Sequence, residues 1–161
     1  DCGFTEELLD KHPDGRFDVV IASMLIEHLV DPFSVARKIA KKLKPGGQFL
    51  FSTHMLDTFE FKVYREYCSC LDLPTHMVFL RRKDIEDMLK DAFTDIRIVH
   101  QPNAVDFGRS SEWRREYGKP ELMDRAVAKL KGGRLLEVTA LLAAWAGLTN
   151  RISVTCRKRR T

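Results

Sequence analysis

The sequence predicts an α/β fold in which strands and helices alternate around one core. The chain has 161 residues, of which 44% are hydrophobic, enough for one core and for a single domain over residues 1–161. Apolar runs typical of strands alternate with apolar patterns of helical spacing. Because helical crossovers join parallel strands, this order predicts a largely parallel sheet flanked by helices.

The first strand pattern is Phe17 to Ser23, a nearly continuous apolar run rich in β-branched residues. Such a run is typical of a strand covered on both faces, so we expect an interior strand. Asp31 and Pro32 then supply an N-cap and a favoured first helical residue. The predicted helix ends before Pro45-Gly46-Gly47, because proline and glycine terminate helices. Gln48 to Thr53 is the next predicted strand.

The second half repeats the alternation. A helix is predicted where apolar residues recur at helical spacing and acidic residues occupy the first turn, and a final strand where apolar and polar residues alternate. The predicted elements are a helix over Ile85 to Phe93, a strand over Ile96 to His100, helices over Pro120 to Leu130 and Arg134 to Leu148, and a strand over Ile152 to Cys156.

Charge and cysteine content narrow the functional classes. The 27 Lys+Arg against 23 Asp+Glu give a net charge of +4, which does not predict a dedicated nucleic-acid binder. The four cysteines form no C-x-x-C pair, and we interpret them as reduced thiols. No basic-then-apolar leader and no apolar run of ~20 residues are found, so we expect no membrane partner and a cytoplasmic location.

Three motifs between residues 17 and 53 carry a family resemblance. They are FDVV at 17–20, EHL followed by DP at 27–32, and LKPGG at 43–47. In order and spacing they resemble the core of class I S-adenosylmethionine-dependent methyltransferases, above all the ubiquinone- and menaquinone-biosynthesis type. The segments His76 to Phe93 and Asn150 to Lys158 are similar to later parts of that family.

The resemblance implies a seven-stranded sheet in the order 3-2-1-4-5-7-6, with the seventh strand antiparallel. This chain would supply strands four to seven, a partial Rossmann-like sheet flanked by helices. The Gly-rich turn that approaches the cofactor has no counterpart here, so we expect the nucleotide-holding half to precede residue 1. The 17–23 strand would then have an open edge, covered by that half, by a partner chain or in a homodimer; we favour the first.

The resemblance also places one wall of an S-adenosylmethionine site on this chain. Ser23, Met24 and Glu27 follow the 17–23 strand, where the family places residues that face cofactor and substrate. Asp1 would accept a hydrogen bond from the adenine amino group, and the backbone amide of Cys2 would read the adenine ring. The alternative for Asp1 is a plain solvated residue.

Two histidines are the candidate catalytic residues. His28 is a candidate general base for a substrate proton, the alternative being a histidine that packs against the following turn. His54 follows the next strand and would line the acceptor pocket, unless it is an ordinary loop residue. Similar ubiquinone-type enzymes carry a second Glu three residues before Glu27, where this chain has Met24; we therefore expect a structural Glu27 and no metal site. We expect His76 to be structural.

The leading hypothesis is an enzyme that transfers a methyl group from S-adenosylmethionine to a small-molecule acceptor, with this chain as its carboxyl-terminal part. The protein would align the acceptor for in-line displacement and help to remove its proton. The alternative is a noncatalytic methyltransferase-like scaffold or partner-binding module that cannot bind the cofactor by itself, because a fold does not certify an activity.

Overall fold

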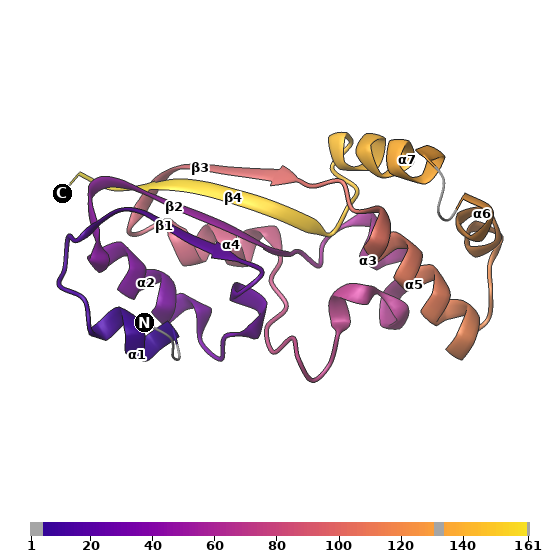
Figure 1. Cartoon of the computed structure of the whole chain (residues 1–161), viewed down its shortest axis with the longest axis horizontal. Helices are drawn as coiled ribbons and strands as arrows, with labels where there is room; N and C mark the ends of the chain where they lie inside the picture. Colours follow the sequence, from indigo (N-terminus) through magenta and orange to yellow (C-terminus); the bar gives the residue numbers. More distant parts are fainter. Residues whose placement is uncertain (1–4, 131–133, 161) are drawn as a thin grey trace.

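The computed structural model describes residues 5–130 and 134–160. The chain forms two parts that lie next to each other in Figure 1. The sheet lobe contains the four strands together with helices α1, α2 and α4. The helical lobe contains helices α3, α5, α6 and α7.

Within the described residues, the sheet has four strands in the order β1-β2-β4-β3. They are β1 (Phe17–Ser23), β2 (Leu43–His54), β3 (Phe93–His100) and β4 (Arg151–Lys158). β1 pairs with β2 in parallel, whereas β4 is antiparallel to both β2 and β3. This order confirms the expected strands four to seven with an antiparallel last strand. The expectation of a largely parallel sheet was wrong, since β4 separates β2 from β3 and leaves a single parallel pairing.

Helices α1 (Thr5–Asp10), α2 (Pro32–Lys42) and α4 (Arg82–Leu89) lie along one face of the sheet (Figure 1). As predicted, Asp31 caps α2, and its side chain accepts a hydrogen bond from the Ser34 amide at 2.9 Å. The core lies between these helices and the strands. Its fully buried apolar side chains include Val35, Leu43, Phe49, Ile85, Leu89, Phe93, Ile152 and Val154.

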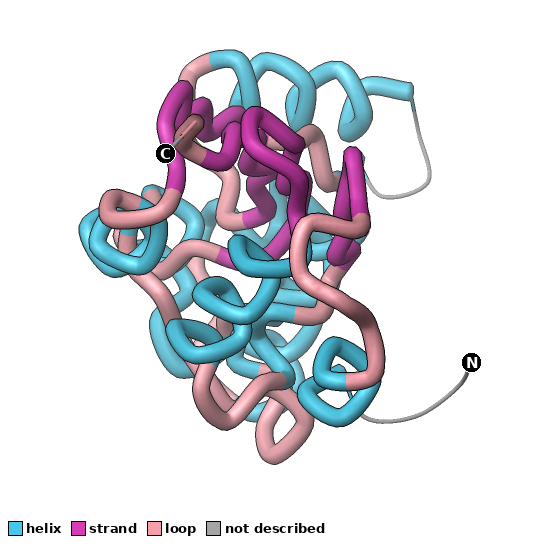
Figure 2. Tube along the Cα trace, turned by 90° about the vertical axis from the view of Figure 1, so that its left-hand side faces the viewer, coloured by secondary structure: helices cyan, strands magenta, loops and turns pink. Residues whose placement is uncertain are grey.

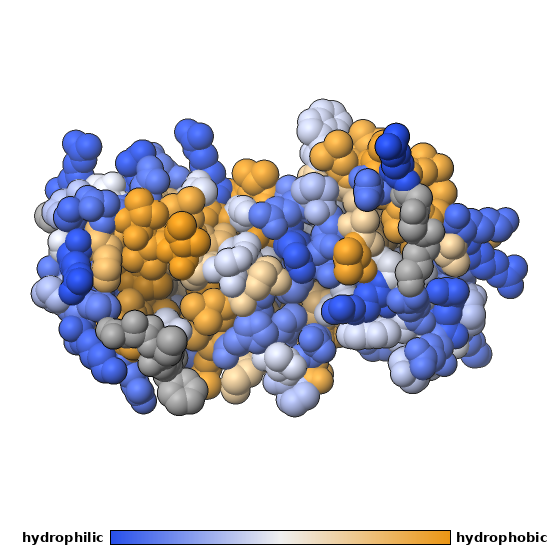
Figure 3. Space-filling view, viewed as in Figure 1, coloured by the Kyte–Doolittle hydropathy of each residue, from blue (hydrophilic) through white to orange (hydrophobic). Residues whose placement is uncertain are grey.

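β1 lies at the edge of the described sheet, not in its interior. Its outward side chains are partly in solvent, with Val19 45% exposed and Ile21 71% exposed. Figure 3 shows apolar surface on this side of the sheet lobe. The continuous apolar run was the basis for expecting an interior strand, but within the described residues only β2 pairs with it, so one row of its backbone groups is open.

The helical lobe is built from α3 (Phe59–Tyr64), α5 (Ala104–Tyr117), α6 (Leu122–Leu130) and α7 (Arg134–Trp145). Figure 2, turned by 90°, shows most helices below the strands, and the helix above them is α7, which Figure 1 places beyond the strand ends. The sequence predicted α6 and α7 but not α5. The reason is that the buried side of α5 is mostly polar, consisting of Asp106, Gly108, Ser110, Ser111 and Arg114.

Two boundaries differ from those predicted. The predicted 85–93 helix ends at Leu89, because Phe93 instead begins β3 and is buried in the core. β2 begins at Leu43, five residues before the predicted start at Gln48. Gly47 lies within this strand, where a larger residue would not fit, because a Cβ there would lie 2.9 Å from the Lys44 carbonyl oxygen. Within residues 5–130 and 134–160, no helix combines the length and the apolar character that a membrane span requires.

Candidate functional site

The candidate site lies where β1 and β2 end at the same edge of the sheet. A turn at Met24 leads from β1 into the 3-10 helix Ile26–His28, and His54 ends β2. The Met24 amide donates to the Ser52 carbonyl oxygen at 3.0 Å, and Met24 has a φ of 48°. This turn places Glu27 and His28 beside the end of β2.

Glu27 is a buried carboxylate with one satisfied oxygen. Its side chain is 2% exposed, and the Thr53 hydroxyl donates to Oε2 at 2.9 Å. Oε1 has no hydrogen-bond partner among the described residues. The nearby Nδ1 of His54 is 3.8 Å from Oε1, too far for a hydrogen bond.

His28 and His76 are held in the same way. Nδ1 of His28 donates to the Thr75 carbonyl oxygen at 2.9 Å, and Nδ1 of His76 donates to the Cys70 carbonyl oxygen at 2.8 Å. Because a carbonyl oxygen can only accept, these bonds place the proton on Nδ1 and leave a lone pair on each Nε2 when the rings are neutral. The two ring centroids are 4.9 Å apart.

Glu27, His28 and His76 converge on one point. Each offers one ligand atom, and the three atoms all lie within 4.8 Å of one another. The segment after His76 is fixed to the same place, since the Met77 and Val78 amides both donate to the Glu27 carbonyl oxygen. A carboxylate oxygen and two imidazole nitrogens can take up a proton or hold a metal cation.

The convergence was only partly predictable. Glu27 and His28 were candidates because they follow a strand, whereas His76 was expected to be structural. No sequence spacing links His76 to the other two, because 47 residues separate it from the nearer one in the sequence and a loop brings it back.

His54 connects the site to the helical lobe. Its Nε2 donates to Oδ2 of Asp106 at 3.4 Å, and its ring lies 5.2 Å from that of His76. Asp106 is buried on α5, where Asn103 donates to it and Arg151 lies 3.3 Å away. Asp106 was missed because α5 itself was not predicted.

Only some of the predicted cofactor-binding residues lie within the described part of the chain. Asp1 and Cys2 lie outside the described residues. Ser23 is exposed at the end of β1, with its Oγ 3.3 Å from that of Ser52, and Met24 follows it. The structure brings Ser23, Met24, Glu27, His28 and His54 to one sheet edge; their roles toward a cofactor or acceptor remain predictions.

A thiol pair lies behind the site. Cys68 and Cys70 are buried free thiols with their sulfur atoms 3.1 Å apart, and Nδ2 of Asn150 donates to Cys68 at 3.4 Å. The hydrogen bond from Cys70 lowers the pKa of Cys68 to about 7, and the same bond raises the pKa of Cys70. Burial raises the pKa of nearby Glu60 to about 8.

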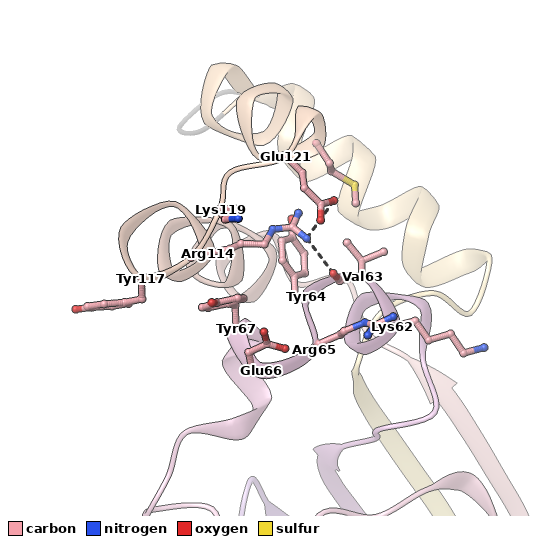
Figure 4. Close-up of a pocket in the computed structure, with 12 residues that line it drawn as sticks. Lys62, Val63, Tyr64, Arg65, Glu66, Tyr67, Arg114, Tyr117, Lys119 and Glu121 are labelled. Atoms are coloured by element: carbon pink, nitrogen blue, oxygen red, sulfur yellow. Dashed lines mark hydrogen bonds and ion pairs between the residues drawn. The ribbon is translucent and has the colours of Figure 1, made fainter.

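A separate open pocket of about 880 Å³ lies in the helical lobe (Figure 4). Tyr67 and Tyr117 line it, together with charged side chains of both signs. Its most buried cation, Arg114, is already bound by Asp124. None of the lining residues belongs to the site at the sheet edge. Because Arg114 is already paired with Asp124, we take the sheet edge, with its unpaired Glu27 oxygen, as the candidate functional site.

Comparison with solved structures defines the class of protein. A methyltransferase from Archaeoglobus fulgidus described as S-adenosylmethionine-dependent superposes with a TM-score of 0.58 at 18% identity, over 98% of this chain and 66% of that one. Geranyl diphosphate C-methyltransferase from Streptomyces coelicolor A3(2), bound to S-adenosyl-L-homocysteine, gives 0.53 at 13% identity, over 91% and 47%. The fold is that of a class I methyltransferase.

Sequence comparison names the family. Residues 3–94, more than half of the chain, match the methyltransferase domain family, and the chain belongs to that family. Ubiquinone biosynthesis O-methyltransferase of Sodalis glossinidius is 46% identical over 48 residues, which cover 30% of this chain and 19% of the relative. The enzyme of the same name from Marinobacter nauticus is 36% identical over 101 residues, covering 58% and 42%. The chain thus matches less than half the length of these relatives.

Proposed function

We propose that the protein transfers a methyl group from S-adenosylmethionine to a small-molecule acceptor at the carboxyl edge of β1 and β2. Membership of the methyltransferase domain family supports the reaction class. The S-adenosylhomocysteine bound to the Streptomyces enzyme supports the cofactor, and the O-methyltransferase relatives favour a hydroxyl acceptor. Ser23, Met24 and Glu27 then form one wall of the cofactor site, with Asp1 and Cys2 as further candidates.

The convergence of Glu27, His28 and His76 is the observation that carries this proposal. In the reaction, the acceptor oxygen attacks the methyl carbon, the carbon–sulfur bond breaks, S-adenosylhomocysteine leaves, and the acceptor gives up its proton. The three side chains each bring a possible proton acceptor within 4.8 Å of the other two, and such a group beside a bound acceptor would favour the loss of that proton.

The three groups have different access to the acceptor. Glu27 and His76 are buried, whereas His28 is half-buried and presents its Nε2 lone pair from the most accessible position. His28 is therefore the residue that the acceptor meets. His54, held by Asp106, lines the inner side of the acceptor site.

We also propose a covering partner for the open edge of β1. Exposed apolar side chains and unpaired backbone groups on one strand favour pairing with a further strand. The rest of the same protein is the first candidate, and a partner chain or a second copy is the alternative. The free thiols favour a reducing compartment such as the cytoplasm.

The test is methyl transfer from labelled S-adenosylmethionine by the full-length protein to phenols, carboxylic acids and amines. His28→Ala should lower kcat by about 10²-fold or more, the usual contribution of a positioned acid-base group. His100→Gln is the matched control, because Nδ1 of His100 bonds the Thr149 carbonyl oxygen at 2.7 Å in the same manner but outside the site. The control should keep full activity.

Two results would contradict the proposal. One is full activity of His28→Ala on every acceptor that the wild type methylates. The other is a full-length protein that binds no S-adenosylmethionine, which would support the scaffold alternative. Residues 1–161 alone should show no measurable S-adenosylhomocysteine binding in calorimetry, and micromolar binding would disprove the single-wall assignment.

A further inference from the structure

We propose that Glu27, His28 and His76 form a binding site for a divalent transition metal ion. The inference rests on the proposed function only for the catalytic use of the ion; metal binding itself is tested without cofactor or acceptor. It also replaces our expectation of no metal site, which considered only a second carboxylate at position 24 and no ligand from the distant His76.

The histidine tautomers are the first support. Metal-bound imidazoles almost always donate their other N–H to a carbonyl or carboxylate, which fixes the ring and directs the free lone pair to the metal. Nδ1 of His28 and Nδ1 of His76 both make such bonds, at 2.9 Å and 2.8 Å. Both rings are thus prepared as Nε2 ligands before any ion binds.

The unpartnered carboxylate oxygen is the second, independent support. A buried polar atom without a partner is costly, and its presence in a folded protein calls for a bound water or ion. Oε1 of Glu27 is such an atom, while the Thr53 hydroxyl holds Oε2 in place. Oε1 is therefore free to serve as the third ligand.

The local charges favour a cation. Asp106, the neighbouring buried carboxylate, has Arg151 at 3.3 Å. Among the residues that the structure describes, Glu27 has no Arg or Lys partner, and Nδ1 of His54, 3.8 Å from Oε1, makes no hydrogen bond to it. A metal ion at the convergence point would neutralise Glu27.

The ligand set indicates the kind of metal. Two imidazole nitrogens and one carboxylate oxygen suit zinc, iron(II) and cobalt(II), whereas magnesium prefers oxygen ligands and keeps several waters. Three protein ligands leave a coordination position open, as in catalytic zinc sites. His28 is the half-buried member of the set, so an acceptor hydroxyl could reach an ion here. Such an ion would lower the pKa of that hydroxyl. With the ion bound, this effect would replace direct proton acceptance by His28, whose Nε2 lone pair would then bind the metal.

The experiment measures metal binding by the chain after chelator treatment. Calorimetry with zinc chloride should show one equivalent bound, and magnesium chloride should bind at least about 100-fold more weakly. Cobalt chloride should give visible absorption bands of a nitrogen and oxygen site without a thiolate-to-cobalt band in the near ultraviolet. That spectrum separates the proposed site from the Cys68 and Cys70 thiols.

Variants locate the ion. His76→Gln and Glu27→Gln should each weaken zinc binding by about 100-fold or more, since losing a ligand exceeds the 10–100-fold cost of losing an outer partner. His28→Gln removes a half-buried ligand and serves if either buried variant fails to fold, as judged by circular dichroism. His100→Gln and the double variant Cys68→Ser with Cys70→Ser should bind zinc as the wild type does.

Three results would overturn the inference: no zinc binding by the folded chain, zinc binding that survives all three ligand substitutions, or zinc binding that is lost only in the double cysteine variant. None of them depends on methyl transfer. A chain that binds zinc while the full-length protein methylates nothing would separate failure of the proposed function from failure of this inference.

Discussion

The sheet lobe and the helical lobe are held together by different interactions. The sheet lobe buries a continuous apolar cluster that includes Phe49, Ile85 and Phe93. The helical lobe has a small apolar cluster around Tyr64, and most of its fully buried groups are polar: Glu60, Ser110, Ser111, Arg114 and Asp124. Apolar packing is non-directional, whereas a buried polar group depends on one partner in one place. Loss of a single buried polar partner should therefore destabilise the helical lobe strongly, whereas the sheet lobe depends on many apolar contacts together.

The candidate site lies where the lobes meet. Glu27, His28 and His54 come from the ends of sheet-lobe strands, while Asp106 on α5 receives the hydrogen bond from His54. His76 is held by the Cys70 carbonyl oxygen, beside the thiol pair that packs with α3. Changes in the helical lobe should consequently reach the site through His54 and His76.

The largest effect is expected at Arg114. Its side chain is 4% exposed and donates to both Asp124 carboxylate oxygens, at 2.8 and 2.9 Å. The guanidinium also donates to the Val63 carbonyl oxygen at 2.9 Å and lies over the Tyr64 ring. Arg114→Met leaves Asp124 buried without its cation and should lower the free energy of unfolding by about 3–5 kcal/mol. Urea unfolding measures the loss, with Arg115→Met, at the exposed neighbouring position, as the control.

An unchanged stability of Arg114→Met would show that the helical lobe does not depend on this ion pair. An equal loss in Arg115→Met would show that α5 responds to any lost charge. Either outcome would remove the contrast between the lobes.

The next effect is the pH dependence caused by Glu60. Burial raises its pKa from the ordinary 4.5 to about 8. The folded state therefore holds a proton that the unfolded state releases. The contribution of Glu60 to stability is fully present below about pH 4.5 and is lost as the pH rises to about 8. Glu60→Gln cannot ionise. It should be more stable than the wild type by a few kcal/mol at pH 8.5 and similar to it at pH 4.

Thermal unfolding at several pH values checks this expectation. Glu66→Gln, at an exposed position two residues beyond α3, should keep the wild-type pH dependence. If the wild type shows no loss of stability between pH 5 and pH 8, the raised pKa of Glu60 is wrong.

The same contrast explains what the sequence could predict. β1, the start of α2 and β4 follow from apolar periodicity and an Asp-Pro cap, because apolar packing leaves a regular pattern. α5 leaves no such pattern, since residues such as Asp106 and Arg114 on its buried side are polar. Likewise, His76 joins the site through one carbonyl bond and a returning loop, and neither has a signature in local sequence. The strand-end candidates were predictable, and their long-range partners were not.

A smaller effect on the free energy of unfolding is expected from substitution of Met24, at the turn between β1 and the candidate site. Its φ of 48° is unfavourable for a side chain with a Cβ, and its amide hydrogen bonds to Ser52 do not involve that side chain. Met24→Gly should raise the free energy of unfolding by about 0.5–1 kcal/mol, because relief of strain exceeds the entropy that glycine adds to the unfolded chain. Leu25→Gly, at a φ of −119°, should instead lower it. A loss in both variants would show that Met24 is not strained.

The smallest effect on stability is expected at the open edge of the sheet. Ile21 is 71% exposed on β1, so Ile21→Ser should change the free energy of unfolding by no more than about 0.5 kcal/mol. The same substitution should reduce self-association of the chain in sedimentation experiments, because Ile21 is an exposed apolar side chain on the strand whose backbone edge is open. Val99→Ser is the matched control, since Val99 is 61% exposed on β3 at the opposite edge. If both variants reduce self-association equally, apolar exposure in general drives it, and β1 is not the preferred edge.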